Sequence, residues 1–430
     1  MRGNRVACLS LAALLAGVPA RAQVDKGDTA ASELVRIAIE RNRDFLALRQ
    51  RADEARGLLR QAGVRPVPTV EIEGATGRPL RTVGEEEYSA GYFHVVETSG
   101  KRDKRVQVAQ KSLDLAESEI SERIRQLSFE IKTRYAEAVA EKRKLDAIDR
   151  LIGVNRESIR LTEARVSTGD AAPLEAQLLL TELNRADAQR AVLVGRLEGL
   201  QLDLRRIAGM ARSDALPRSD RLVVPGADYR LEELQERAAR MRPDLRIARL
   251  LEEQAAAEAG LAEAQTHPDF TVSARYSQRN ARFDAFGLNA AGAPVPLRDR
   301  DHIVTFGLAI PLLTRKRNQG NIDAAASRVA AARLRREYLE AAIPLELEAA
   351  YQRWSGARRY VDLLDRGVIQ QSERNLDVIR QAYNLGQLRV LDVLNEQRRL
   401  IETQLAYIDA QAEQFRAFAE MERAAGGGIQ

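Results

Sequence analysis

The side chains best suited to catalysis or metal binding are few and scattered. The chain has three histidines and one cysteine, which leaves no Cys/His cluster for a zinc or iron–sulfur site and no disulfide. His94, His267 and His302 lack a nearby Ser or Cys nucleophile arrangement, a phosphate-binding glycine loop and the HExxH spacing of a metalloprotease. The sequence therefore predicts no enzyme, no cofactor and no resident metal site.

Charge is abundant but interleaved. The 430 residues include 67 basic and 62 acidic side chains, with a formal net charge of +5. The two signs mix within helical stretches, as in Glu122-Arg123-Ile124-Arg125, whereas nucleic-acid binders concentrate basic charge on one face. We therefore expect no nucleic-acid partner. A composition of 30% charged and only 5% aromatic residues suits long solvent-facing helices better than a large enzyme core.

The first 22 residues have the pattern of a signal peptide. Arg2 and Arg5 precede an apolar run over 6–18, and Ala20-Arg21-Ala22 fits a small-x-small cleavage site. Cys8 is not preceded by the apolar stretch that a lipoprotein signal needs, which argues against lipidation. No later segment approaches the ~18 uninterrupted apolar residues of a membrane-spanning helix. If the exported chain crosses a membrane, it must do so with strands.

The sequence pattern indicates an internal duplication. A shift of 200 places Asp44 on Asp244 and Ala62 on Ala262, and a shift of about 217 places Gly169 on Gly386. Each copy is expected to contain a short helix, two strands, a very long helix, a glycine turn and a returning helix.

The helices are expected to be unusually long. No proline occurs over 101–168, and only Pro344 over 312–385, so each segment could run roughly 100 Å at 1.5 Å per residue. Small apolar residues recur at helical spacing, as in Ala109, Leu113 and Ala116, a pattern that packs helices side by side. A periplasmic coiled-coil scaffold without channel activity is the alternative interpretation of these helices.

Four segments alternate like half-buried strands. Apolar residues occupy every second position over 270–276 and again over 304–310, and strands of ~9–11 residues with one apolar face match the wall of an outer-membrane barrel. A soluble sheet packed on a helix explains the alternation equally well. Four strands cannot close a barrel, so several protomers must share one. The residues expected to face lipid are Val70, Ile72, Phe93, Val95, Phe270, Val272, Tyr276, Val304, Phe306 and Leu308.

Three motifs, in this order and with the duplication, resemble the TolC-like outer-membrane factors, and most closely their CzcC-like heavy-metal-efflux branch. They are Ser99-Gly100-Lys101-Arg102, the stretch from Ile310 to Ile322, and Tyr383-Asn384-Leu385-Gly386 with the following Leu391-Asp392-Val393-Leu394. The resemblance implies a homotrimer in the outer membrane, whose twelve strands form one barrel and whose twelve helical columns form a periplasmic tunnel. It also implies passive efflux, with a periplasmic adaptor protein and an inner-membrane pump of the RND type.

The resemblance further implies two sites at the helical tips. Asp392 matches the first of two aspartates that ring the tunnel mouth in the family, while the second position is Asn395, followed by Glu396. A lone Asp near a helix start can also simply favour the helix dipole. His267 and His302 could contact a metal cation in transit. The residues expected to dock the adaptor are Ser167, Thr168, Gly169, Asp170, Leu385, Gly386, Gln387 and Leu388.

The expected fold class is mainly α with a membrane β-barrel, internally duplicated, with four strands per protomer. The expected function is the exit duct of a tripartite efflux system, with heavy-metal cations as a candidate cargo. The expected segments are a signal peptide (1–22), periplasmic helices (23–65), a strand pair (66–98), a long helical hairpin (99–210, tip near 167–173), an equatorial linker (211–230), second-copy helices (231–266), a second strand pair (267–311), a second helical hairpin (312–424, tip near 384–391) and a flexible tail (425–430).

Overall fold

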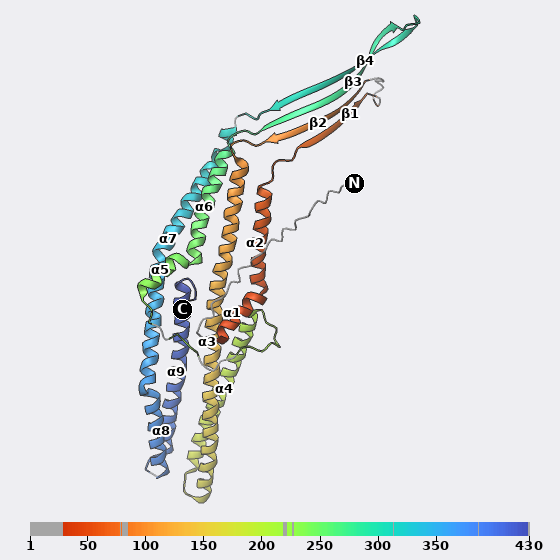
Figure 1. The fold of residues 1–430 in the computed structure, drawn as a ribbon. Coiled ribbons are helices and arrows are strands. Elements are labelled where there is room, and N and C mark those ends of the chain that lie inside the picture. The colour runs from red at the N-terminus through yellow and green to blue at the C-terminus, as the bar shows by residue number, and fades with distance from the viewer. Residues whose placement is uncertain are drawn as a thin grey trace, which may run out of the picture.

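The computed structural model describes residues 29–77, 79, 85–217, 222–225, 228–312, 314–385 and 387–428. The expected signal peptide and Gly386 lie outside these residues. The described chain is a long rod of helices that carries a four-stranded sheet at one end (Figure 1).

The same order of elements occurs twice along the chain. The first series is α1 (Thr29–Arg41), α2 (Arg43–Ala62), β1 (Thr69–Thr76), β2 (Glu86–Val96), α3 (Lys101–Thr168) and α4 (Pro173–Ala208). The second is α5 (Leu231–Met241), α6 (Pro243–Ala264), β3 (Phe270–Leu288), β4 (Pro294–Ala309), α7 (Thr314–Leu363), the π-helical turn η2 (Leu364–Val368), α8 (Ile369–Asn384) and α9 (Val390–Ala424).

The helices pack side by side as columns. Next to the sheet they contact one another in the row α2–α3–α6–α7, and farther away α3 packs on α4 while α7 and α8 pack on α9 (Figure 1). The 68 residues of α3 occupy the proline-free segment found in the sequence, which confirms a helix about 100 Å long. No described helix is both long and apolar enough to cross a membrane.

The second long helix is interrupted, unlike the first. Pro344 is accommodated inside α7, but the helix widens into the π turn η2, where Gly367 has φ 142°. This positive φ lies in a region that glycine tolerates and side-chain-bearing residues rarely adopt. The expected single helix over this part of the chain is therefore divided into α7 and α8.

The sheet is antiparallel in the order β1-β2-β3-β4. Thr69 on β1 pairs with Phe93 on β2, and β2 pairs with β3 as far as Glu86 opposite Asn280. β3 and β4 continue as a hairpin beyond that point. Among the described residues, β1 and β4 each have one edge without a strand partner.

Two apolar cores stabilise the middle of the rod. One joins α1, α3 and α4 around Leu34, Leu127 and Ile131. The other joins α5, α7 and α9 around Trp354 and Met421. Both lie far from the sheet, so the helices depend on one another rather than on the strands. The mainly helical content with one small sheet confirms those parts of the predicted fold class.

Candidate functional site

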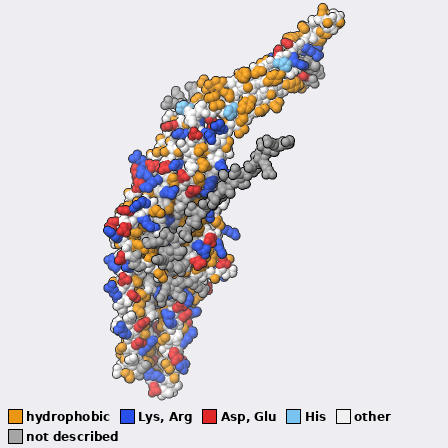
Figure 2. All heavy atoms as spheres, viewed as in Figure 1, with side chains coloured by type: hydrophobic (Ala, Val, Ile, Leu, Met, Phe, Trp, Pro, Cys, Tyr) orange, Lys and Arg blue, Asp and Glu red, His pale blue; other side chains and the backbone are white. Residues whose placement is uncertain are grey.

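One face of the sheet is apolar and exposed. Cross-strand partners share a face, and the register brings Val70, Tyr92 and Phe306 into one row and Ile72 and Tyr276 into the next. Phe306 is 80% exposed and Ile72 82% exposed. Figure 2 shows this part of the sheet as a largely hydrophobic band, in contrast to the mixed charges that cover the rod.

The register contradicts the lipid-facing prediction for two residues. Phe93 pairs with Thr69 and Ser273, and Val95 pairs with Thr271, so both lie on the opposite face from the other eight predicted residues. Apolar residues occur in both phases of β2, which made its orientation ambiguous from the sequence alone. The β2 residues that share the apolar face are Tyr88, Ala90, Tyr92, His94 and Val96.

The face that carries Phe93 and Val95 is mainly polar. Arg275 on β3 lies between two carboxylates of β1, with Nη2 3.2 Å from Glu71 Oε2 and Nη1 hydrogen-bonded to Glu73. Nη1 also donates to Ser89 Oγ at 3.0 Å. The guanidinium covers the ring of Phe93 at 5.5 Å from its centroid. The sheet therefore has the two-sided polarity of a wall between an apolar medium and water.

The first helical tip is a tight glycine turn. Gly169 has φ 81° and its N–H bonds to the α3 carbonyls, as a left-handed C-cap requires. Thr168 Oγ1 donates to Asp170 Oδ2 at 2.6 Å, and Pro173 occupies the first turn of α4. Ser167, Thr168, Gly169 and Asp170 are all exposed.

The second tip presents exposed apolar side chains. Leu385, Gln387 and Leu388 are exposed, whereas Gly386 lies outside the described residues. The two tips are joined at Tyr383, whose hydroxyl donates to Glu175 Oε2 on α4 at 2.9 Å and whose ring lies under Arg165 of α3. Burial, together with the neighbouring Glu175, raises the pKa of Tyr383. Tyr383 stood in a family motif, but its partner could not be inferred from the sequence.

The three gate candidates have different surroundings. Asp392 is exposed in the first turn of α9, where Oδ2 accepts the N–H of Arg389 at 3.0 Å. Asn395 is exposed one turn later. Glu396 is buried and pairs with Arg399 at 3.4 Å. Asp392 and Asn395 therefore share the free side of α9, while Glu396 faces the protein interior.

The histidines do not gather into a site. His302 lies on the apolar face of the sheet, where its Nδ1 is 2.6 Å from the hydroxyl of Tyr276. His94 lies on the same face, and His267 lies before β3 beside Thr266. In the described part of the chain, no group of three His, Cys, Asp or Glu side chains could hold a metal ion. The polar face of the sheet carries none of the three histidines.

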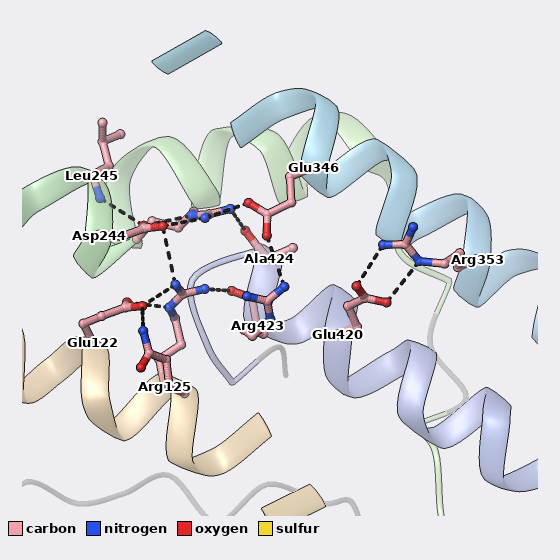
Figure 3. Close-up of polar contacts among 11 residues, drawn as sticks. Glu122, Arg125, Asp244, Leu245, Glu346, Arg353, Glu420, Arg423 and Ala424 are labelled. Carbon is pink, nitrogen blue, oxygen red and sulfur yellow. Dashed lines mark hydrogen bonds and ion pairs between the residues drawn. The ribbon is translucent and has the colours of Figure 1, made fainter. Parts of the chain in front are cut away.

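Sequence reasoning missed a buried charged cluster halfway along the rod (Figure 3). Arg125 of α3 binds Glu122 at 2.7 Å and donates to the carbonyl of Arg423 at 2.5 Å. Arg242, before α6, donates to Asp244 at 2.6 Å and to Glu346 of α7 at 2.9 Å. We call the contact of residues 241–244 with residues 423–426 the second joint.

The first joint is the corresponding contact between residues 41–43 and residues 207–210. Asn42 donates through Nδ2 to the carbonyl of Ile207 at 2.7 Å, and its Oδ1 accepts the N–H of Phe45. Gly209 has φ 67°, and a Cβ there would lie 2.6 Å from the carbonyl oxygen of Arg41. Each joint thus connects the end of a long return helix to the start of a shorter helix that leads to the sheet.

Comparisons with known proteins agree with this architecture. The family described as outer membrane efflux protein matches residues 34–210 and 234–427. A search of curated proteins finds no match.

Three channel structures illustrate the likeness. VceC of Vibrio cholerae is 20% identical, with 93% of this chain and 97% of that chain covered and a TM-score of 0.71. CmeC of Campylobacter jejuni is 13% identical, with coverages of 94% and 87% and a TM-score of 0.75. MtrE of Neisseria gonorrhoeae, in an open state, is 18% identical, with coverages of 94% and 90% and a TM-score of 0.73. At these identities, the likeness shows the fold.

Proposed function

Because the chain belongs to the outer membrane efflux protein family, we propose that it forms the exit channel of a tripartite efflux system. Family membership places the chain in the outer membrane and confirms the expectation that it is not an enzyme. The channel conducts passively, so it needs a water-filled path rather than reactive groups.

The main support for this proposal comes from the sheet. It is apolar and exposed on one face and polar on the other, and its outer strands β1 and β4 each leave an edge unpaired among the described residues. Unpaired backbone groups are very costly in hydrocarbon. Pairing β4 of one copy with β1 of the next removes every open edge when the ring closes. Three such four-stranded sheets give a barrel of twelve strands, with the polar face of Arg275 toward its lumen.

The helical row has its open sides in the same places. α2 leads into β1 and α7 follows β4, and these two helices are the ends of the row α2–α3–α6–α7. On α7, Leu334, Tyr338 and Leu345 are exposed at spacings of four and seven residues, which places them on one side of the helix. The same rotation that pairs the strands brings this stripe toward α2 of the next copy, which supports a tunnel continuous with the barrel.

The far tips are the proposed contact with the periplasmic adaptor, which connects the channel to an inner-membrane pump of the RND type. They lie at the opposite end of the rod from the sheet (Figure 1), and the exposed Leu385 and Leu388 of the second tip offer apolar contacts. Asp392 lies just beyond this tip and is free to face the tunnel axis. A ring of three such carboxylates favours cations.

Heavy-metal cations are the cargo that we propose to test first. The support is the resemblance of the tip motifs to the heavy-metal branch and the exposed carboxylate of Asp392. A passive duct needs no resident metal ligands, because selection can occur in the pump.

Fractionation and transport assays test this function. We expect the mature protein in outer membranes, where detergent extracts it as a trimer, and we expect deletion of its gene to lower resistance to zinc, cobalt or cadmium. Recovery as a detergent-independent monomer or dimer from periplasm would instead support a coiled-coil scaffold. If the protein forms trimers in the outer membrane but its deletion leaves metal resistance unchanged, the channel proposal stands and the proposal of a metal cargo is wrong.

A further inference from the structure

The hairpin of β3 and β4 extends well beyond the rest of the sheet (Figure 1). β2 stops pairing with β3 at Asn280, whereas β3 and β4 remain paired to Leu288 opposite Pro294. We call residues 283–297 the outer arm. Its strands leave the sheet at the end opposite to the helical rod.

The outer arm has a defined turn. Asn289 Oδ1 accepts the N–H groups of Ala291 and Ala293, each at 3.0 Å. The N–H of Asn289 donates to the carbonyl of Ala293 at 3.0 Å, and Gly292 takes φ 79°. The turn therefore holds the two strands in one geometry without help from a core.

Both faces of the outer arm carry exposed apolar side chains. Phe286 pairs with Pro296 on one face, where Phe286 is 70% exposed. On the other face Gly287 pairs with Val295, and the side chain of Leu297 lies over Gly287. An isolated two-stranded hairpin is marginally stable in water, and large exposed apolar patches mark contact sites. We therefore expect the arm to contact a partner on both faces.

A charged belt separates the outer arm from the apolar band of the sheet. Figure 2 shows charged side chains between the hydrophobic band and the far end of the hairpin. On the face that carries the apolar band, the belt consists of Arg282, Arg298 and Arg300, while Arg279, Asp299 and Asp301 lie on the opposite, polar face. Because charged side chains lie at or outside the membrane boundary, the arm extends past the lipid into water, and hydrocarbon does not cover it.

On the proposed trimeric channel, the other copies lie within reach. A barrel of twelve strands tilted by ~40° has a backbone radius of about 12 Å. The eight residues from Ala281 to Leu288 span about 26 Å when extended. An arm that leans over the mouth therefore reaches the axis, where it meets two identical apolar arms.

We propose that the three outer arms pack against one another over the external mouth of the barrel and restrict entry from outside. The contact buries Phe286 and Leu288 of each copy between symmetry-related arms. This inference rests on the proposed trimer and adds an outer constriction to it.

Crosslinking tests the contact between arms. Leu288→Cys, made in a Cys8→Ser background, is expected to give dimers of the chain with a short bismaleimide in intact cells. Arg279→Cys is the matched control, because in the ring its three copies lie on the wall roughly 20 Å apart. Equal crosslinking at both positions, or products of Leu288→Cys that contain lipopolysaccharide or another protein instead of a second copy, would overturn the proposal.

A shortened variant tests the restriction itself. Arg282 and Arg298 are cross-strand partners, so replacing residues 283–297 with Asn-Gly closes the hairpin with a tight turn. Thr305→Cys on the polar face then reports access to a polyethylene-glycol maleimide added outside the cells. We expect labelling at least about tenfold faster in the shortened chain, as for removal of a hydrophobic constriction.

Native mass spectrometry and an efflux assay distinguish the proposed arm contact from the proposed trimeric channel. Trimers that export normally but label Thr305→Cys equally with and without the outer arm refute the arm contact alone. A chain that forms no trimer refutes the proposed channel, and the outer constriction with it.

Discussion

At the first joint a single neutral asparagine connects the end of α4 to the start of α2. At the second joint two arginines and three carboxylates surround the end of α9, which itself contributes Arg423. Positive side chains are favourable at a helix C-terminus, and both Arg125 and Arg242 donate to carbonyls there. The second joint also draws together α3, α6, α7 and α9, while the first joins only neighbours in its own half.

The difference continues toward the tips. α3 runs unbroken to Gly169. The column of α7 and α8 instead contains the π turn η2, in which Asp365 accepts a hydrogen bond from Tyr407 of α9 at 3.0 Å. The half with the charged joint is therefore also the half with the interrupted helix. We infer that the second joint fixes this hairpin at the end of α9.

The largest expected effect separates the two joints. Arg242→Ala leaves Asp244 and Glu346 without their main buried partner, so it should cost about 3–5 kcal/mol of unfolding free energy. Asn42→Ala removes one neutral cap and should cost about 1–2 kcal/mol. Denaturant unfolding followed by helical circular dichroism measures both. The control is Arg249→Ala, also on α6, which breaks an exposed pair with Glu340 of α7 and should cost under about 1 kcal/mol.

Equal losses of unfolding free energy for Arg242→Ala and Asn42→Ala would mean that the charged cluster stabilises its joint no more than one asparagine does. The inference that the second joint fixes its hairpin would then fail, although the channel proposal would stand.

A smaller effect compares the middle of the rod with the first tip. Gly209 and Gly169 both have positive φ, but only Gly209 approaches another backbone, that of Arg41. Gly169→Ala should therefore cost about 1–2 kcal/mol of unfolding free energy for the left-handed conformation, and Gly209→Ala a further ~1–3 kcal/mol for the clash. Thermal unfolding of the two detergent-solubilised variants compares these costs. If Gly169→Ala is the more damaging, the tip turn is supported by contacts absent from the single chain.

The pH dependence of stability gives a further test of the charged cluster at the second joint. Burial alone would raise the pKa of Asp244, but the hydrogen bond and charge of Arg242 and the charge of Arg125 hold it below its ordinary value. A depressed carboxyl pKa stabilises the fold above the unfolded pKa of about 3.9. The contribution is lost as pH falls through the lower folded value.

The difference in unfolding free energy between the wild type and Arg242→Ala should therefore narrow below about pH 4, because the carboxylate of Asp244, left without Arg242, becomes neutral. Unfolding midpoints measured from pH 6 to pH 3 test this. A gap that stays constant over this range would mean that Asp244 does not carry the cost of the substitution.

The sequence predicted the parts of the fold that depend on local patterns. The helix over Lys101–Thr168 and the reversal at Gly169 followed from the absence of proline and the presence of glycine. The phase of β2 did not follow, because Phe93 is apolar yet lies on the polar face under Arg275. A side chain that is apolar but covered by a guanidinium gives the same alternation signal as one in lipid.

The second joint could not be predicted, because its charges come from segments hundreds of residues apart, such as Arg125 and Arg423. One signal was nevertheless present. The shift of 200 that aligns Asp44 with Asp244 also places Asn42 on Arg242, a change from a neutral cap to a charged one at the same position. The π turn left no comparable trace, since Gly367 resembles any glycine within a helical pattern.

The smallest expected effect on stability comes from the tips, where it distinguishes a gate from a helix cap. Asp392→Asn weakens the hydrogen bond from the N–H of Arg389 and should cost only about 0.5–1 kcal/mol of unfolding free energy. Asp170→Asn at the first tip is the matched control, because Asp170 is also exposed and accepts a local hydrogen bond from Thr168. If Asp392 faces the axis in three copies, its substitution should reduce cation selectivity and cation block of the channel in planar bilayers, while Asp170→Asn leaves both unchanged. A cap with no route to the pore cannot alter selectivity, so identical currents from the two variants would leave Asp392 with its helix-capping role alone.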